Sequence, residues 1–147
     1  MRRRLVVSAA AFFVGTSLHA QRVQPELRVE VLGPKPYLMA PGLGAVIPIG
    51  YYVRAGAAVG YLPTDIRLSN RWHADLITRL TLDPFREQRW GLSVGGGLSY
   101  HRRRMSLAVI ADLEGPEMRG WLPAFQVGLS GGFRAGLILR RAVPGRR

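Results

Sequence analysis

Apolar residues alternate with small or polar residues along much of this chain, a period of two that predicts β-strands with two different faces. In the segment 51–61, one face is apolar with a tyrosine at each tip, and the other carries Arg54 among mostly small residues. The segment 90–100 has the same form, with Trp90 and Tyr100 at its tips. We predict eight strands in this way, at residues 26–32, 42–49, 51–61, 71–82, 89–100, 105–113, 121–130 and 132–141.

The segments between these strands have the composition of chain reversals. Gly33-Pro34 and Gly131-Gly132, for example, combine residues that favour turns. No helical spacing of apolar residues follows the first twenty positions. Short strands joined in succession by turns predict an all-β fold, and we expect an antiparallel up-and-down β-barrel of about eight strands after an N-terminal signal peptide.

The apolar faces have the length and the aromatic ends that suit a membrane. A β-strand of about 9–11 residues tilted in a bilayer spans its apolar band, and aromatic rings favour the headgroup region at either end. The opposite faces are small or charged, as in Gly91, Ser93 and Gly95. We expect the apolar faces to contact lipid and the small faces to line a narrow, filled barrel. Because a soluble β-sandwich or barrel also alternates, that alternative stays open.

The first twenty residues have the order of parts found in a secretory signal peptide. Arginines at positions 2–4 precede a largely apolar run at 5–14, and small and polar residues follow as far as Ala20. The apolar run is shorter than the ~20 residues that a helical membrane span needs. We expect cleavage after Ala20, which gives a signal peptide at residues 1–20 and one barrel domain at residues 21–147.

Charge and cysteine content exclude several classes of protein. The chain has 21 basic residues, nine acidic residues and no cysteine. Loss of residues 1–20 removes three basic residues and leaves a net charge of +9. An exported basic protein meets anionic lipid headgroups, and we expect no nucleic-acid partner. The absence of cysteine excludes a disulfide framework, a thiolate metal site and a cysteine nucleophile.

This pattern resembles that of the small eight-stranded outer-membrane β-barrel proteins of Gram-negative bacteria, over nearly all of residues 21–147. The resemblance lies in the alternation, the aromatic strand ends and the turns. It implies an integral protein of the cell outer membrane, whereas the soluble alternative would lie in the periplasm. Pro48 and Pro123 depart from a regular ladder because proline has no amide hydrogen to donate, and we expect both at strand ends or bulges.

Charged residues on the small faces are expected to meet inside the barrel. Both signs occur there, and a buried charge is tolerated only when it is paired and hydrogen-bonded. We expect this cluster to fill and fix the interior rather than to gate the passage of solutes. The predicted lumenal cluster of ion pairs consists of Arg54, Asp75, Arg79, Asp112 and Arg134, with Glu114 as a further acidic candidate.

Few residues suit catalysis or metal binding. His73 and Asp75 share one strand face, as do Ser99 and His101, so a lipid-modifying outer-membrane hydrolase is one alternative. No flanking motif accompanies these pairs, and we expect a protein that is not an enzyme. Two histidines after residue 20, without a spaced acidic cluster, predict no metal site, and we expect no cofactor.

The sequence also predicts contacts with lipid at one rim of the barrel. Arg102, Arg103 and Arg104 follow the fifth predicted strand, which runs outward when the chain starts in the periplasm. These arginines are candidates to bind phosphates of lipopolysaccharide through charge-assisted hydrogen bonds. We expect a monomer that contacts outer-membrane lipid and serves envelope structure or surface interaction. A soluble periplasmic protein would instead use its apolar face to bind a ligand or a partner.

Overall fold

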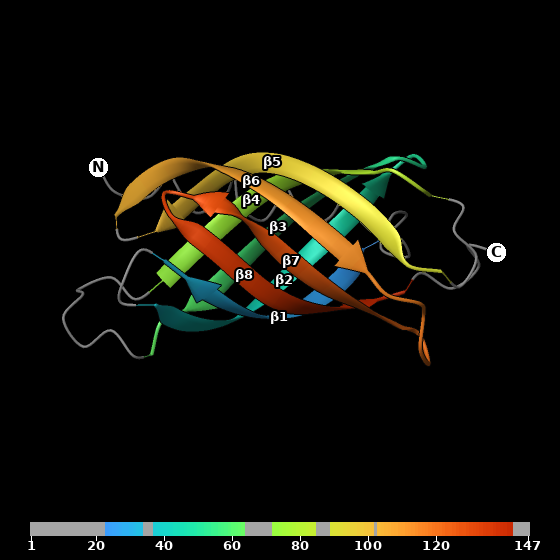
Figure 1. The fold of residues 1–147 in the computed structure, drawn as a ribbon, viewed down its shortest axis with the longest axis horizontal. Coiled ribbons are helices and arrows are strands. Elements are labelled where there is room, and N and C mark those ends of the chain that lie inside the picture. The colour runs from blue at the N-terminus through green and yellow to red at the C-terminus, as the bar shows by residue number, and fades with distance from the viewer. Residues whose placement is uncertain (1–22, 34–36, 64–71, 85–88, 102, 143–147) are drawn as a thin grey trace, which may run out of the picture.

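The alternating segments form eight antiparallel strands that close into a barrel, with β1 paired to β8 (Figure 1). The computed structural model describes residues 23–33, 37–63, 72–84, 89–101 and 103–142. Each strand pairs with its neighbours in sequence, so the predicted all-β up-and-down barrel is confirmed. The strands are β1 (Gln24–Leu32), β2 (Leu38–Ile49), β3 (Val53–Tyr61), β4 (Trp72–Thr81), β5 (Gly91–His101), β6 (Arg104–Glu114), β7 (Trp121–Ser130) and β8 (Phe133–Arg141).

The strand boundaries differ from the prediction mainly around the first hairpin. β2 begins at Leu38 rather than at residue 42, because Leu38 to Pro41 already pair with β1. β3 begins at Val53 because Tyr51 and Tyr52 lie in the turn after β2. Gly50 in this turn has a positive φ of 75°, which glycine adopts without the penalty that a β-carbon imposes. The proposed signal peptide lies outside the described residues.

The barrel has two distinct ends. We call the end where β1 begins and β8 ends the terminal end; it also holds the turns after β2, β4 and β6. The opposite, distal end holds the turns after β1, β3, β5 and β7. The strands run obliquely to the long axis between these ends (Figure 1). In the described part of the chain, no helix is long and apolar enough to cross a membrane.

The prolines of the strands lie where a strand has a neighbour on one side only. Pro48 extends past the last β1–β2 pair, Gln24 with Val46, and is paired with β3 alone. Pro123 is paired with β8 alone, since the β6–β7 ladder ends at Ala124. The expectation that both lie at strand ends is therefore confirmed. A missing amide hydrogen costs little there, because no second strand requires it.

Glycines leave room for the long side chains that point inward. Glu30 lies opposite Gly136 across the β1–β8 pair, and Arg79 lies opposite Gly95 across the β4–β5 pair. A β-carbon at Gly136 would lie only 2.8 Å from the Glu30 Cγ atom. The inward cross-strand pairs of this kind are Glu26–Gly44, Arg28–Gly42, Glu30–Gly136, His73–Gly60, Arg79–Gly95, Glu114–Gly91 and Arg134–Gly128.

Closure of the barrel predicts that a disulfide forms between β1 and β8. Val31 and Ala135 are directly opposed outward residues of these strands. Opposed residues in an antiparallel pair have Cα atoms about 4.5–5.5 Å apart, within the range that a disulfide bridges. In a Val31→Cys/Ala135→Cys variant we expect rapid oxidation to an intramolecular disulfide, measured as a mobility shift on a non-reducing gel. A Val31→Cys/Leu98→Cys control joins β1 to β5 and should not cross-link; equal cross-linking of both variants would contradict closure.

Candidate functional site in the lumen and on the outer wall

The lumen encloses a balanced set of charged side chains. Five arginines and five carboxylates on the strands are buried, with exposed fractions of 7% or less. The two signs cancel among these ten strand residues. The buried charged residues are Arg28, Arg54, Arg79, Arg134 and Arg140 with Glu26, Glu30, Asp75, Asp112 and Glu114.

Arg134 organises the charges of the distal half. Its Nη2 atom donates to the Glu30 Oε2 atom at 2.8 Å and to the Asp75 Oδ2 atom at 2.5 Å. The His73 Nε2 atom lies 3.3 Å from the same Glu30 oxygen. Charge-assisted hydrogen bonds of this length are the stronger kind, and they tie β8 to β1 and to β4 across the lumen.

Glu114 and Glu26 organise the charges of the terminal half. The Glu114 Oε1 atom accepts hydrogen bonds from the Nη1 atoms of Arg54 and Arg140, each at 2.5 Å. Arg140 also donates from its Nε atom to the Glu26 Oε1 atom at 2.6 Å. These three bonds connect β3, β6, β8 and β1, which are not all neighbours in the sheet.

Arg28 joins the two halves into one network. It contacts Glu30 on the distal side, and its Nη1 atom lies 4.0 Å from the Glu26 Oε2 atom on the terminal side. Its Nη2 atom also donates to the Gln126 Oε1 atom at 2.7 Å. The Gln126 Nε2 atom donates to Asp112 at 2.6 Å, and Asp112 accepts a further bond from Arg79 at 2.6 Å. All ten lumenal charges are thereby connected.

The structure brings the sequence-predicted lumenal residues together in pairs. Asp75 contacts Arg134, Arg79 contacts Asp112, and Arg54 contacts Glu114. Sequence reasoning missed the residues that connect these pairs. Their signal is present in the alternation, because they share the inward parity of β1, β7 and β8. The missed residues are Glu26, Arg28, Glu30, Gln126 and Arg140.

An apolar cluster covers the distal end of the lumen. Leu32 and Leu38 flank the turn after β1, and Leu62 follows β3. These side chains are buried with Ala40, and Leu62 has no exposed surface.

Three potential metal ligands meet in the distal half of the network. The ligand atoms of Glu30, His73 and Asp75 lie within 4.8 Å of one another. The Arg134 guanidinium already donates to both carboxylates, so their negative charge is compensated by an arginine. We therefore assign these three residues to the ion-pair network.

The residues considered for hydrolysis pair with other partners. The Ser99 hydroxyl hydrogen-bonds the Asp75 carboxylate and receives a bond from Ser130 at 3.2 Å. His73 contacts Glu30. A serine nucleophile is activated by a hydrogen bond to a base such as histidine, and the contacts of Ser99 in this network are to a carboxylate and a hydroxyl.

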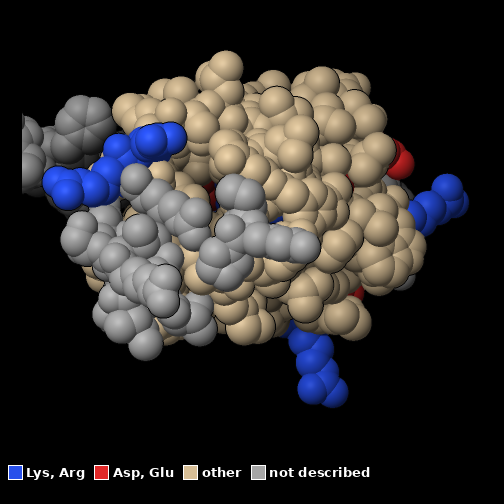
Figure 2. All heavy atoms as spheres, turned by 60° about the vertical axis from the view of Figure 1, so that its left-hand side comes forward, with Lys and Arg blue, Asp and Glu red and all other residues tan. Residues whose placement is uncertain are grey.

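The outer wall is apolar and ends in aromatic rings. Within the eight strands that the structure describes, the only charged residue at an outward position is Arg141, at the end of β8. On the face that Figure 2 shows, most of the described surface is uncharged, basic side chains project at a few places, and small acidic patches are visible. The rings at the terminal end are Tyr51, Tyr52, Trp90 and Trp121, and those at the distal end are Tyr37, Tyr61, Trp72, Tyr100 and Phe133.

Two of the three arginines predicted to contact lipid lie at the distal rim. Arg103 occupies the tight turn between β5 and β6 with a positive φ of 63°, and Arg104 is the first residue of β6. Both side chains are exposed. Arg102 lies outside the described residues.

Comparison of the chain with protein-family models, with curated proteins and with solved structures found no match.

The network predicts a large loss of stability when Glu114 is removed. In Glu114→Ala, the guanidinium groups of Arg54 and Arg140 lose a shared buried acceptor. Breaking a buried ion pair by removing one partner costs about 3–5 kcal/mol, and we expect a loss of that size in the free energy of unfolding. Urea unfolding followed by tryptophan fluorescence in phospholipid vesicles measures it. Glu117→Ala, in the exposed turn that follows, is the control; similar values for both variants would contradict the network.

Proposed function

We propose that this protein is an integral outer-membrane β-barrel of a Gram-negative bacterium, with a filled and charged interior, that serves envelope structure or surface and lipid interaction without catalysis. The observation that carries the proposal is the outer wall, which is apolar between two sets of aromatic rings. Transmembrane β-strands have this arrangement, with an apolar band flanked by aromatic girdles. The strands have 9–12 residues, which is enough to cross the hydrocarbon core when tilted.

The wall is difficult to reconcile with a protein dissolved in water. Side chains such as Leu107, Val109 and Leu137 are between 64% and 78% exposed. Monomeric soluble proteins rarely expose continuous apolar surface of this kind, so a soluble form would need a partner around most of the barrel. Lipid supplies that cover on every side at once.

The lumen supports a role that does not depend on solute passage. Its long side chains are joined across the barrel, and Arg79, Arg134 and Arg140 are at most 1% exposed. A solute would have to break several charge-assisted hydrogen bonds to pass. The interior therefore acts as a structural core, and we expect lipid or other partners to bind at the wall and the rims.

Fractionation of the native cell envelope tests the proposal. A second test introduces a charged residue on the wall and measures the change in stability. We expect recovery in the outer membrane and migration on a detergent gel that shifts with heating. Arg in place of the exposed Val109, in the middle of β6, should cost about 2–4 kcal/mol of stability in a bilayer, against about 0–1 near the interface. Met118→Arg is the interfacial control, since Met118 is 58% exposed in the turn after β6.

The outcomes separate the two classes of protein. In a soluble protein, replacing exposed Val109 or exposed Met118 with arginine would change the free energy of unfolding little. Recovery in the soluble periplasmic fraction, with equal unfolding free energies for Val109→Arg and Met118→Arg, would favour the soluble periplasmic β-protein that binds a ligand or a partner.

The arginines at the distal rim are candidates for lipopolysaccharide contact. When the terminal end of the barrel faces the periplasm, the distal end faces outward, and Arg103 and Arg104 are exposed there. Replacing Arg102, Arg103 and Arg104 with Gln should weaken the binding of fluorescent lipopolysaccharide by at least about tenfold, because each basic residue near an anionic surface contributes ~1 kcal/mol. Arg89→Gln/Arg119→Gln is the control at the terminal end. An unchanged affinity, or an equal loss in the control, would contradict this role.

A further inference from the structure

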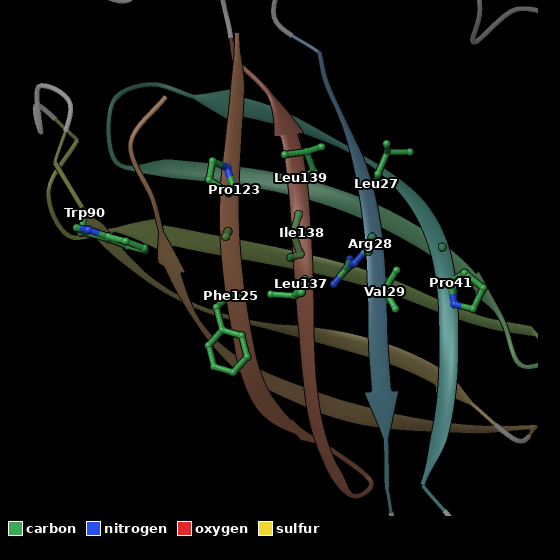
Figure 3. Close-up of a pocket in the computed structure, with 12 residues that line it drawn as sticks. Leu27, Arg28, Val29, Pro41, Trp90, Pro123, Phe125, Leu137, Ile138 and Leu139 are labelled. Carbon is green, nitrogen blue, oxygen red and sulfur yellow. The ribbon is translucent and has the colours of Figure 1, made fainter. Parts of the chain in front are cut away.

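The outer wall is hollowed across β7, β8, β1 and β2 (Figure 3). The hollow has a volume of about 590 Å³ and an apolar lining. Its floor follows two rows of opposed outward residues. One row runs through Pro123, Leu139 and Leu27, and the next through Phe125, Leu137, Val29 and Pro41.

Two prolines mark the sides of the hollow where the sheet lacks a full set of neighbours. Pro123 lies beyond the β6–β7 ladder, and Pro41 lies just before the first β2–β3 pair, Gly42 with Gly60. Gly115 beside Pro123 has no side chain, and the Trp90 ring lies close to the same position. Pro123 and Trp90 thus pack against the Gly115 backbone at one side of the hollow, and Pro41 lies at the other.

A cation lies one outward row beyond the lining of the hollow, toward the terminal end. The outward pair that follows Pro123–Leu139 toward this end is Trp121–Arg141. The Arg141 guanidinium carbon lies 5.5 Å from the centroid of the Trp121 ring, a cation–π contact. Arg119 is exposed in the preceding turn, and Glu117 is an acidic residue of the same turn. Arg141 is the single charge among the outward strand positions described above.

We propose that this hollow binds one anionic phospholipid, with the phosphate at Arg141 and an acyl chain that extends from there across the two apolar rows. The proposal rests on the proposed membrane location. An arginine can donate two parallel hydrogen bonds to a phosphate, and a tryptophan beside it suits the headgroup level. The combination of an apolar hollow and one cation just beyond it matches a lipid, which has a long apolar chain and one charged head.

Tryptophan quenching by brominated lipids tests the site. The chain has three tryptophans, and Trp72→Phe/Trp90→Phe leaves only Trp121, which lies beside Arg141. This protein is placed in phosphatidylcholine vesicles with increasing fractions of dibrominated phosphatidylglycerol or dibrominated phosphatidylcholine. The ratio of the two association constants at Trp121 is the measured quantity.

We expect a ratio of about five in favour of phosphatidylglycerol, the effect of one cation near an anionic headgroup. Arg141→Gln should reduce the ratio to about one, and Arg104→Gln at the distal rim should leave it unchanged. Leu137→Phe/Leu139→Phe fills the hollow and should lower quenching by phosphatidylglycerol. The matched control is Leu76→Phe/Leu80→Phe on β4, where the side chains are also exposed and the quenching should not change.

Each result supports or overturns a separate statement. Quenching by both brominated lipids with a ratio of one in the parent would overturn the lipid site and leave the membrane location standing. A preference that persists in Leu137→Phe/Leu139→Phe would assign it to headgroup attraction alone and overturn the hollow as the site. A lack of quenching by either lipid would show that the barrel does not insert, and would overturn the proposed function.

Discussion

Ten charged side chains enclosed by a narrow sheet are the constraint on which this structure depends. Unpaired ions in such an interior would destabilise the fold by several kcal/mol each, so every one must find a partner. Arg28 makes the continuous arrangement possible because it reaches Glu26, Glu30 and Gln126 from one position in β1. The network therefore fixes the positions of strands that are not adjacent in the sheet.

The register of the strands makes the network sterically feasible. Long inward side chains lie opposite glycines on the neighbouring strand, as with Glu30 and Gly136. A shift of one residue in any pair would bring the apolar wall into the lumen and turn the charges outward. Charge pairing, glycine placement and the apolar wall thus select the same register.

In this barrel the charged side chains lie inside and the apolar side chains lie outside, the reverse of a soluble protein. This arrangement leaves few places for specific interaction. The interior is occupied by its own ion pairs, and the middle of the wall presents apolar side chains to its surroundings. Under the proposed function, we expect specific recognition at places where a charge adjoins the wall. Arg103 and Arg104 provide this at the distal rim, and Arg141 beside Trp121 provides it at the terminal end.

The alternation of residues by itself determined the strands, the two faces and the inward position of Arg54, Asp75, Arg79, Asp112 and Arg134, because a strand places every second side chain on one side. It could not say which inward residues meet. Contacts such as Arg134 with Glu30, and Arg28 with Gln126, join positions about a hundred residues apart in the chain. Only closure of the barrel and the register of its pairs bring them together, and only that register places Pro41 and Pro123 beside the outward leucines that line the hollow on the wall.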